Sequence, residues 1–174
     1  MKSLLNYITQ EDLIFLNIFN NKIKCKVLDI VMPIFTYMAS AAVTITLCLI
    51  AILNSNTIIH LMGINCALAL AFSNVASQLL KKSVNRTRPF LKIETLYTKK
   101  IGIDVYSFPS GHTTAAFSIC VMVSFFFPET APFLILLASG IGISRMYLGV
   151  HYPSDVMAGM LVGTLTSFLI FFLI

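Results

Sequence analysis

Residue types that could bind and cleave a phosphate ester recur in three short clusters of this sequence. The chain is 57% hydrophobic and only 11% charged, so each ionisable side chain is costly to place and its position is informative. Together the clusters supply two histidines, three cations and one carboxylate. They are Lys81 with Arg88-Pro89, then Pro109-Ser110-Gly111-His112, and then Arg145 with His151 and Asp155.

The third cluster could supply a nucleophile and its orienting group. Pro153 cannot continue a helix but can begin one, so His151 is expected in a loop and Asp155 in the first turn of the last helix. A carboxylate there can accept a hydrogen bond from one imidazole nitrogen, which fixes the tautomer and aims the other nitrogen outward. Attack of that nitrogen on phosphorus would give a phosphohistidine intermediate.

The second cluster leads directly into a predicted helix, whose exposed N–H groups favour an anion. Ser110 adds a hydroxyl, and Gly111 lets the backbone come close to the phosphate oxygens. Protonated His112 could donate a proton to the leaving oxygen, a contribution on the order of 10² to 10⁴ in rate.

Lys81, Arg88 and Arg145 complete the predicted site as a set of cations around the phosphate. Phosphoryl transfer spreads negative charge over the equatorial oxygens, so cations and backbone amides supply most of the catalysis. The sequence lacks the multiple carboxylates that a magnesium or two-metal site would use. We therefore expect neither a metal nor another cofactor.

Each cluster also has a structural explanation when it is considered alone. Lys81, Lys82, Arg86 and Arg88 could be boundary cations that hold a membrane helix in register, which is the commoner role. The Pro-Ser-Gly-His segment could be a turn and helix cap, and the third cluster a structural ion pair. The occurrence of all three on one side of the membrane favours the functional interpretation.

The elements that must position these clusters are membrane-spanning helices. A span needs about 20 helical residues, and five stretches are almost free of charge: 30–53, 56–80, 113–127, 131–149 and 153–174. The third is short and is expected to begin at Ser110. We predict a single all-α membrane domain over 1–174, a bundle of about five transmembrane helices over 30–174. Counting crossings places the three clusters on the same side of the membrane.

Residues 1–29 are expected to contribute a short amphipathic helix lying in the membrane interface, followed by a basic patch at Lys22, Lys24 and Lys26. The favoured interpretation is a solvated, lipid-facing segment with no chemical role.

Two pairs of small residues predict close helix packing rather than ligand contacts. Gly159 and Gly163 form a GxxxG in the last span, and Gly140 and Ser144 form a similar pair in the fourth. Because the GxxxG could serve packing within one chain, the oligomeric state stays open.

The net charge of +5 does not indicate nucleic-acid binding, because the cations collect at predicted membrane boundaries without aromatic-basic repeats. Anionic lipid headgroups are the expected partner.

The three clusters resemble the signature of the type 2 phosphatidic acid phosphatase superfamily, integral-membrane lipid phosphate phosphatases related to vanadium haloperoxidases. The resemblance rests on Lys81 six residues before Arg88-Pro89, on residues 109–112, and on Ser144-Arg145 with the spaced His151 and Asp155. It implies that His151 is the nucleophile, that Asp155 orients it, and that His112 protonates the leaving group. It assigns phosphate binding to Lys81, Arg88, Ser110, Gly111 and Arg145.

The resemblance also implies a reaction, the metal-independent dephosphorylation of a lipid phosphate or diphosphate. Undecaprenyl diphosphate, phosphatidylglycerophosphate, phosphatidic acid and a lipid A phosphate are the candidate substrates. Two alternatives remain, a vanadate-dependent haloperoxidase-like enzyme and a non-catalytic lipid-binding or transport member of the fold. Family members commonly have six spans, and this chain is expected to have five plus the interfacial helix.

The orientation in the membrane is a conflict between two arguments. By the crossing count all twelve Lys and Arg lie on the catalytic side, which by charge bias would place the site in the cytoplasm. Bacterial relatives usually place it on the outer side. We expect a protein of the bacterial cytoplasmic membrane with its site on the outer face.

Overall fold

A computed structural model describes residues 2–99, 101 and 104–173 of the chain. These residues form helices and connecting segments, with no strand among them. The α-helices are α1 (Lys2–Asn17), α2 (Lys26–Met38), α3 (Ala41–Ile52), α4 (Thr57–Val84), α5 (Gly111–Phe126), α6 (Ala131–Tyr147) and α7 (Pro153–Leu173). Shorter helical turns cover Ile18–Lys22, Pro89–Leu91 and Pro128–Thr130. The predicted all-α class is confirmed.

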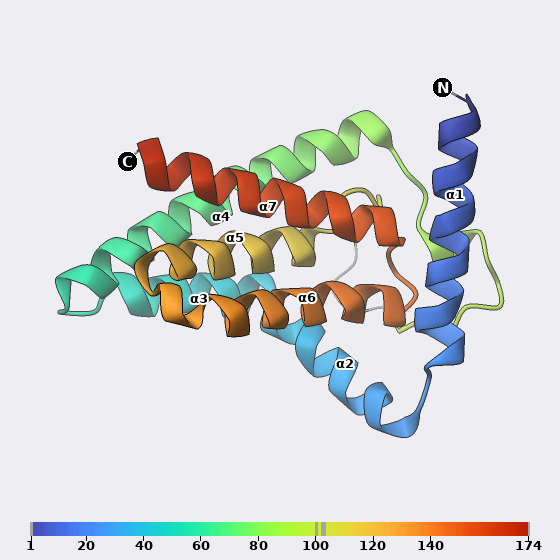
Figure 1. The fold of residues 1–174 in the computed structure, drawn as a ribbon, viewed down its shortest axis with the longest axis horizontal. Helices are drawn as coiled ribbons and strands as arrows, with labels where there is room; N and C mark the ends of the chain where they lie inside the picture. Colours follow the sequence, from blue (N-terminus) through green and yellow to red (C-terminus); the bar gives the residue numbers. More distant parts are fainter. Residues whose placement is uncertain (1, 100, 102–103, 174) are drawn as a thin grey trace.

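The helices α3 to α7 run alongside one another, and α5 is the central one (Figure 1). It contacts α4, α6 and α7. Helix α1 crosses one end of this bundle, the end at which α4 and α6 finish and α5 and α7 begin. All three predicted site clusters therefore come to the same end of the molecule, as the crossing count required.

Three helical stretches are individually long and apolar enough to cross a membrane: Thr57–Leu91, Pro128–Tyr147 and Pro153–Leu173. Helix α5 begins at Gly111 with Ser110 as its N-cap, close to the predicted start. Its 16 residues span about 24 Å, less than a hydrocarbon core. This length is tolerable because neighbouring helices surround α5. The protein is an integral-membrane helical bundle, and the number of spans stays a prediction.

The predicted first span over 30–53 is not one straight helix. It is divided into α2 and α3, which are bent by 50° and together are long enough to form a fourth span. The break has a local cause, because the Ser40 hydroxyl accepts from the amide of Val43 and begins a new helix. Packing differs on the two sides: Thr36 of α2 bonds Ser144 of α6 at 2.7 Å, whereas α3 packs on α4.

Small residues allow the close helix approach that the sequence predicted. A Cβ on Gly159 would lie 2.7 Å from the carbonyl oxygen of Ser110, and one on Gly163 would meet the carbonyl oxygen of Thr114. Both atoms belong to the first turns of α5 or its cap, so the GxxxG joins α7 to α5 within the chain. On α6, a Cβ on Gly140 would lie 2.6 Å from the Phe35 ring of α2.

The N-terminal segment differs from its prediction. Helix α1 is longer than expected, and its interpretation as wholly solvated or lipid-facing is wrong for Asp12, Leu16 and Asn20, which are all at least 98% buried. The Asn20 amide donates to the carbonyl oxygens of Tyr97 and Tyr147, each at 2.8 Å. These bonds fasten the segment to the end of the bundle where the site clusters gather.

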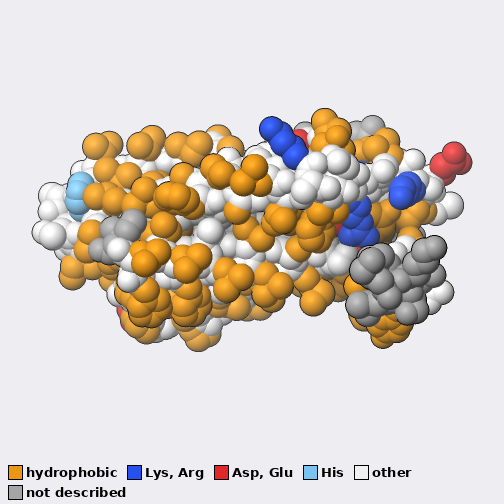
Figure 2. Space-filling model, turned by 90° about the horizontal axis from the view of Figure 1, so that it is seen from above, with side chains coloured by type: hydrophobic (Ala, Val, Ile, Leu, Met, Phe, Trp, Pro, Cys, Tyr) orange, Lys and Arg blue, Asp and Glu red, His pale blue; other side chains and the backbone are white. Residues whose placement is uncertain are grey.

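Hydrophobic side chains cover most of the face drawn in Figure 2, and Lys and Arg gather toward one end of it. A long apolar surface with charge at one end suits a bundle that is surrounded by lipid and reaches the headgroups at that end.

Candidate active site

His151 lies between α6 and α7 and is only 1% exposed. Its Nδ1 is 3.5 Å from Oδ2 of Asp155, which is longer than a well-formed hydrogen bond. Its Nε2 is 3.2 Å from Nη1 of Arg88. Since a guanidinium can only donate, Nε2 must hold the lone pair and Nδ1 the proton. This is the tautomer in which the nitrogen facing away from Asp155 is a nucleophile.

The protonation state of His151 follows from its surroundings. Burial lowers the pKa of His151 to about 4; the contact with Asp155 opposes this shift, and the positive charges of Arg145 and Arg88 add to it. The ring is therefore neutral near pH 7, so its lone pair is available without prior loss of a proton.

Asp155 is fully buried in the first turn of α7, where Pro153 starts the helix as predicted. Its Oδ2 accepts from the backbone amide of Tyr152 at 2.8 Å, and its Oδ1 accepts from Arg86 at 2.6 Å. Both oxygens are thus held in place, and the carboxylate cannot turn away from His151 without losing one of these bonds.

Lys81 and Arg88 converge on one carboxylate, that of Asp104. The Lys81 Nζ lies 2.9 Å from Asp104 Oδ2, and Arg88 Nη2 lies 2.6 Å from Oδ1. Partial burial raises the pKa of Asp104, but the ion pairs with the two cations outweigh it and hold the pKa below its ordinary value. An anionic group therefore already lies between the two cations that the sequence assigned to phosphate binding.

Arg145 occupies the last turn of α6 and is fully buried. Its Nη1 donates to the carbonyl oxygen of Ile101 at 2.9 Å, which ties the long connection between α4 and α5 to this end of the bundle. Its charge acts on His151 as described above, so it belongs to the same electrostatic site.

The start of α5 meets the start of α7 at this site. The backbone amide of Ser110 donates to the carbonyl oxygen of Asp155 at 3.0 Å, and the Ser110 hydroxyl accepts from Thr113 at 2.9 Å. A Cβ built on Gly111 would meet no atom within 4 Å, so its amide faces open space. This fits the predicted approach of backbone to a phosphate.

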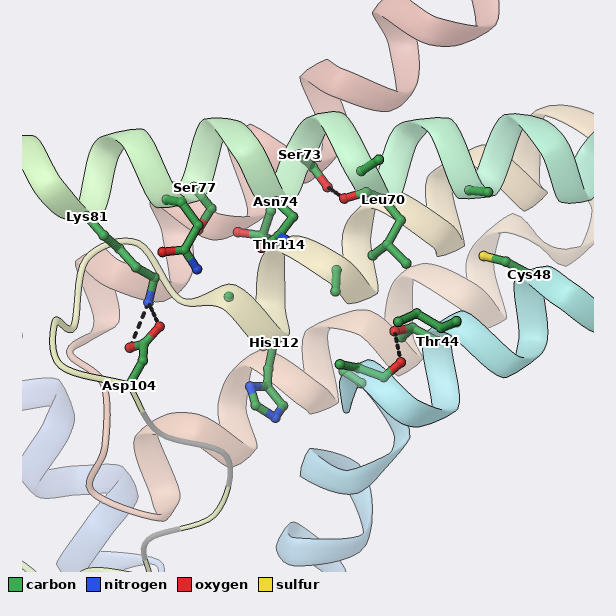
Figure 3. Close-up of a pocket in the computed structure, with 18 of the residues that line it drawn as sticks. Thr44, Cys48, Leu70, Ser73, Asn74, Ser77, Lys81, Asp104, His112 and Thr114 are labelled. Atoms are coloured by element: carbon green, nitrogen blue, oxygen red, sulfur yellow. Dashed lines mark hydrogen bonds and ion pairs between the residues drawn. The ribbon is translucent and has the colours of Figure 1, made fainter.

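A cavity of about 520 Å³ joins the predicted residues, and Lys81, Arg88, Gly111, His112 and His151 all line it. Figure 3 shows Lys81, Asp104 and His112 at one end of this cavity, with Thr44, Cys48 and Leu70 farther along it. With Asp155, Ser110 and Arg145 linked to this end as described, the structure brings together all eight side chains that the sequence selected.

Sequence reasoning missed a network behind Asp155. Arg86 donates through Nη1 to Asp155 and to the Ser154 hydroxyl, at 2.6 and 2.7 Å. Its Nη2 pairs with Asp12 of α1 at 2.6 Å. Asp12 also accepts from the backbone amide of Ser154 at 2.8 Å, and the guanidinium carbon of Arg86 lies 4.0 Å from the centroid of the Tyr152 ring.

Weak signals for these residues were present in the sequence. Arg86 stands two residues before Arg88 and was included among the boundary cations, and Asp12 interrupts an apolar helix. Asp104 is one of the two acids in the long connection of residues 81–109. None of these facts identifies a partner, because the partners come from other helices.

A model of the PAP2 superfamily matches residues 62–174 of the chain. This stretch contains all three clusters. The chain belongs to the PAP2 superfamily.

Curated relatives are named for two activities. The chain is 34% identical over 113 residues to a "Bacitracin transport permease protein BcrC" of Bacillus licheniformis, covering 64% of this chain and 55% of the relative. It is 29% identical over 119 residues to "Phosphatidylglycerophosphatase B" of Bacillus subtilis, covering 62% and 56%. The chain thus spans about half the length of the curated PAP2 relatives that it matches.

Solved structures give the same fold over nearly the whole chain. LpxE of Aquifex aeolicus has a TM-score of 0.78 at 27% identity, covering 91% of this chain and 93% of that one. A transmembrane PAP2-type phosphatidylglycerolphosphate phosphatase of Bacillus subtilis has a TM-score of 0.79 at 23% identity, covering 97% and 86%. The likeness extends to α1 and α2, which lie before the stretch matched by the family model.

Proposed function

We propose that this protein is a metal-independent phosphatase of membrane lipids that works through a phosphohistidine on His151. One observation carries the proposal: the unprotonated Nε2 of His151 lies 3.2 Å from the Arg88 guanidinium, in a cavity that Lys81 and His112 also line. A nucleophile, anion-binding cations and a second imidazole therefore share one space. Membership of the PAP2 superfamily and the phosphatase names among its relatives support the same reaction class.

In the first step, the lone pair on Nε2 attacks phosphorus, a P–N bond forms and the bond to the leaving oxygen breaks. His112 in its protonated form gives its proton to that oxygen. Asp155 stabilises the positive charge that develops on the His151 ring, because its Oδ2 faces Nδ1. The cations, the Ser110 hydroxyl and the Gly111 amide hold the phosphate oxygens.

In the second step, neutral His112 takes a proton from water, whose oxygen attacks phosphorus. The P–N bond breaks, inorganic phosphate is released, and both histidines return to their starting forms. Lys81 and Arg88 must exchange Asp104 for phosphate during this cycle, because all three now form one ion-paired group.

The proposed reaction uses no metal. Among the described residues, no three His, Cys, Asp or Glu side chains gather where they could hold a metal ion. Three cations are available to neutralise the charge that a metal would otherwise offset.

The test is phosphate release from lipid phosphates by the purified protein in EDTA. His151→Ala should abolish turnover, and vanadate should inhibit the unmodified protein. His60→Ala is the matched control, because His60 lies on α4 and bonds the carbonyl oxygen of Ile52, outside the cavity lining. Acid-labile, base-stable phosphate trapped on the protein, absent in His151→Ala, would identify the intermediate. Normal turnover by His151→Ala would end the proposal.

We further propose that the protein lies in the bacterial cytoplasmic membrane with its site on the outer face. The support is the usual orientation of bacterial family members; the gathering of cations at the site end opposes it. In a Cys25→Ser background, Ser55→Cys and Glu129→Cys place thiols in exposed loops at the opposite end. Resistance of these thiols to an impermeant reagent in intact cells is expected, and their labelling would reverse the orientation.

A further inference from the structure

The cavity is layered along α4. At its catalytic end lie the cations Lys81 and Arg88, and the next lining residues are neutral and polar. Beyond them the lining is apolar. The polar layer consists of Asn74, Ser77 and Gln78, and the apolar layer includes Ile45, Leu49, Ile52, Ala67 and Leu70.

Helical spacing places the polar layer on the same face of α4 as Lys81. Positions 74, 77, 78 and 81 are separated by three or four residues, which puts them on one side of a helix. At 1.5 Å of rise per residue, Ser77 lies about 6 Å and Asn74 about 10 Å along the axis from Lys81. Figure 3 shows Asn74, Ser77 and Lys81 directed to the same side of α4.

The polar layer lacks partners within the described part of the protein. The Ser77 hydroxyl is 98% buried and has no hydrogen bond, and the exposed side-chain amides of Asn74 and Gln78 make none to any described residue. Other polar groups of the lining are satisfied on their own helices: Ser73 donates to Leu70 and Thr114 to Ser110. At membrane depth no water supplies a partner, so a ligand must supply it.

The chemistry of the layers separates two kinds of lipid phosphate. In a diacylglycerol phosphate, ester carbonyls lie a few covalent bonds from phosphorus and accept hydrogen bonds, and acyl chains follow. In a polyprenyl diphosphate a second anionic phosphate comes next, and then hydrocarbon alone. Among the described lining residues no cation lies beyond Lys81 and Arg88, so a second phosphate would meet neutral groups, and a bare hydrocarbon would leave them unpaired.

We propose that the cavity takes a glycerolipid phosphomonoester of the phosphatidic acid class, with Asn74, Ser77 and Gln78 donating hydrogen bonds to the ester carbonyls. This inference rests on the proposed phosphatase function and names its substrate class. The three residues determine specificity; they do not touch the reacting atoms.

The first test needs no variant. Specificity constants are measured for a diester phosphatidic acid and for its diether analogue, which has the same chains and phosphate but no carbonyls. The ester should be preferred by about fivefold or more, as expected for one or two hydrogen bonds. Polyprenyl monophosphate and diphosphate should both be poorer substrates than the ester. Equal constants for ester and ether, or preference for either polyprenyl lipid, would overturn the inference.

The second test uses Asn74→Leu and Gln78→Leu, singly and together, with Gln10→Leu as the matched control. Gln10 is an exposed amide on α1, outside the cavity lining. The double variant should lose the ester preference while its activity on the ether analogue stays within about twofold, the scale of an uncompensated surface change. An equal loss on both lipids would contradict carbonyl recognition.

The two proposals fail in different ways. If no lipid releases phosphate, or if His151→Ala retains activity, the phosphatase function fails. If phosphate is released in a manner that depends on His151 but without discrimination between ester and ether, only the specificity inference fails.

Discussion

Arg86 donates a hydrogen bond to Oδ1 of Asp155 at 2.6 Å, while the other oxygen of that carboxylate faces His151. The second terminal nitrogen of Arg86 pairs with Asp12 of α1. The carboxylate that orients the proposed nucleophile is therefore itself oriented, by a cation that is fixed from the far side by another acid. Such supporting shells hold reactive groups within the narrow geometry that catalysis needs.

Arg86→Gln should reduce kcat by about 10- to 100-fold, because Asp155 would lose its fixed position behind His151. KM should change by less than about threefold, since Arg86 is not among the cavity-lining cations. Arg86→Lys should restore part of kcat by keeping one ion pair. Lys82→Gln, which removes an exposed cation of α4, is the control. An unchanged kcat, or a loss confined to KM, would contradict a positioning role.

Asp104→Asn should increase the affinity for inorganic phosphate and vanadate by about tenfold, because the carboxylate that now pairs with Lys81 and Arg88 would no longer compete. The measurement is the inhibition constant of each anion. Glu94→Gln in the same connection is the matched control, since Glu94 is exposed and makes no ion pair with the two cations. Weaker anion binding in Asp104→Asn would instead indicate that Asp104 organises the cations for phosphate.

His151 should remain neutral well below the pH at which an ordinary histidine gains a proton, because its pKa is lowered from 6.5 to about 4. Imidazole ¹⁵N spectra of histidine-labelled protein should show a neutral ring at pH 5.5. His60→Gln and His112→Gln variants would assign the signals. Arg88→Gln should raise the midpoint and Asp155→Asn should lower it, according to the sign of the charge removed. A midpoint near 6.5 in the unmodified protein would contradict the buried, cation-facing placement.

The same shift has a consequence for stability. The folded-state pKa of His151 lies below its ordinary value, so the unfolded chain binds the proton more readily. The contribution of His151 to stability is therefore complete above about pH 6.5 and is lost as the pH falls toward 4. Thermal unfolding in detergent should show this acid sensitivity, and it should diminish in His151→Gln.

Gly163→Ala should destabilise the bundle by about 1–3 kcal/mol, because the added methyl group would meet the α5 backbone at Thr114 and Ser118. Backbone atoms cannot move aside as a flexible side chain can. The measurement is the unfolding temperature, with Leu165→Ala on the exposed side of α7 as control. Activity should fall together with stability, since α5 carries His112 and α7 carries Asp155. An unchanged unfolding temperature would argue against this tight contact.

The sequence predicted the site better than it predicted the path of the chain around it. His151, Asp155 and Pro153 lie close together in sequence, so local helix rules were enough to place them. Lys81 and His112 required only the count of membrane crossings. The break at Ser40 was missed because hydrophobicity continues through it, and only the pull of α2 toward α6 and of α3 toward α4 decides that the helix divides there.

The residues that escaped prediction are those whose roles depend on docking between distant segments. Asp12 and Arg86 are 74 positions apart, and Arg86 and Asp155 are 69 apart. On an isolated amphipathic helix an acid is expected to face water, so nothing local distinguishes Asp12 from Glu11. Only the crossing of α1 over the start of α7 turns that carboxylate inward.

The stretch that the family model matches begins at residue 62, whereas Asp12 stands on α1. A truncated chain that started at α2 would retain every signature residue and still lose a helix that braces them. Arg86 would keep one acidic neighbour instead of two, and the amide of Ser154 would lose its cap. The minimal catalytic unit of this protein is therefore larger than its diagnostic motif.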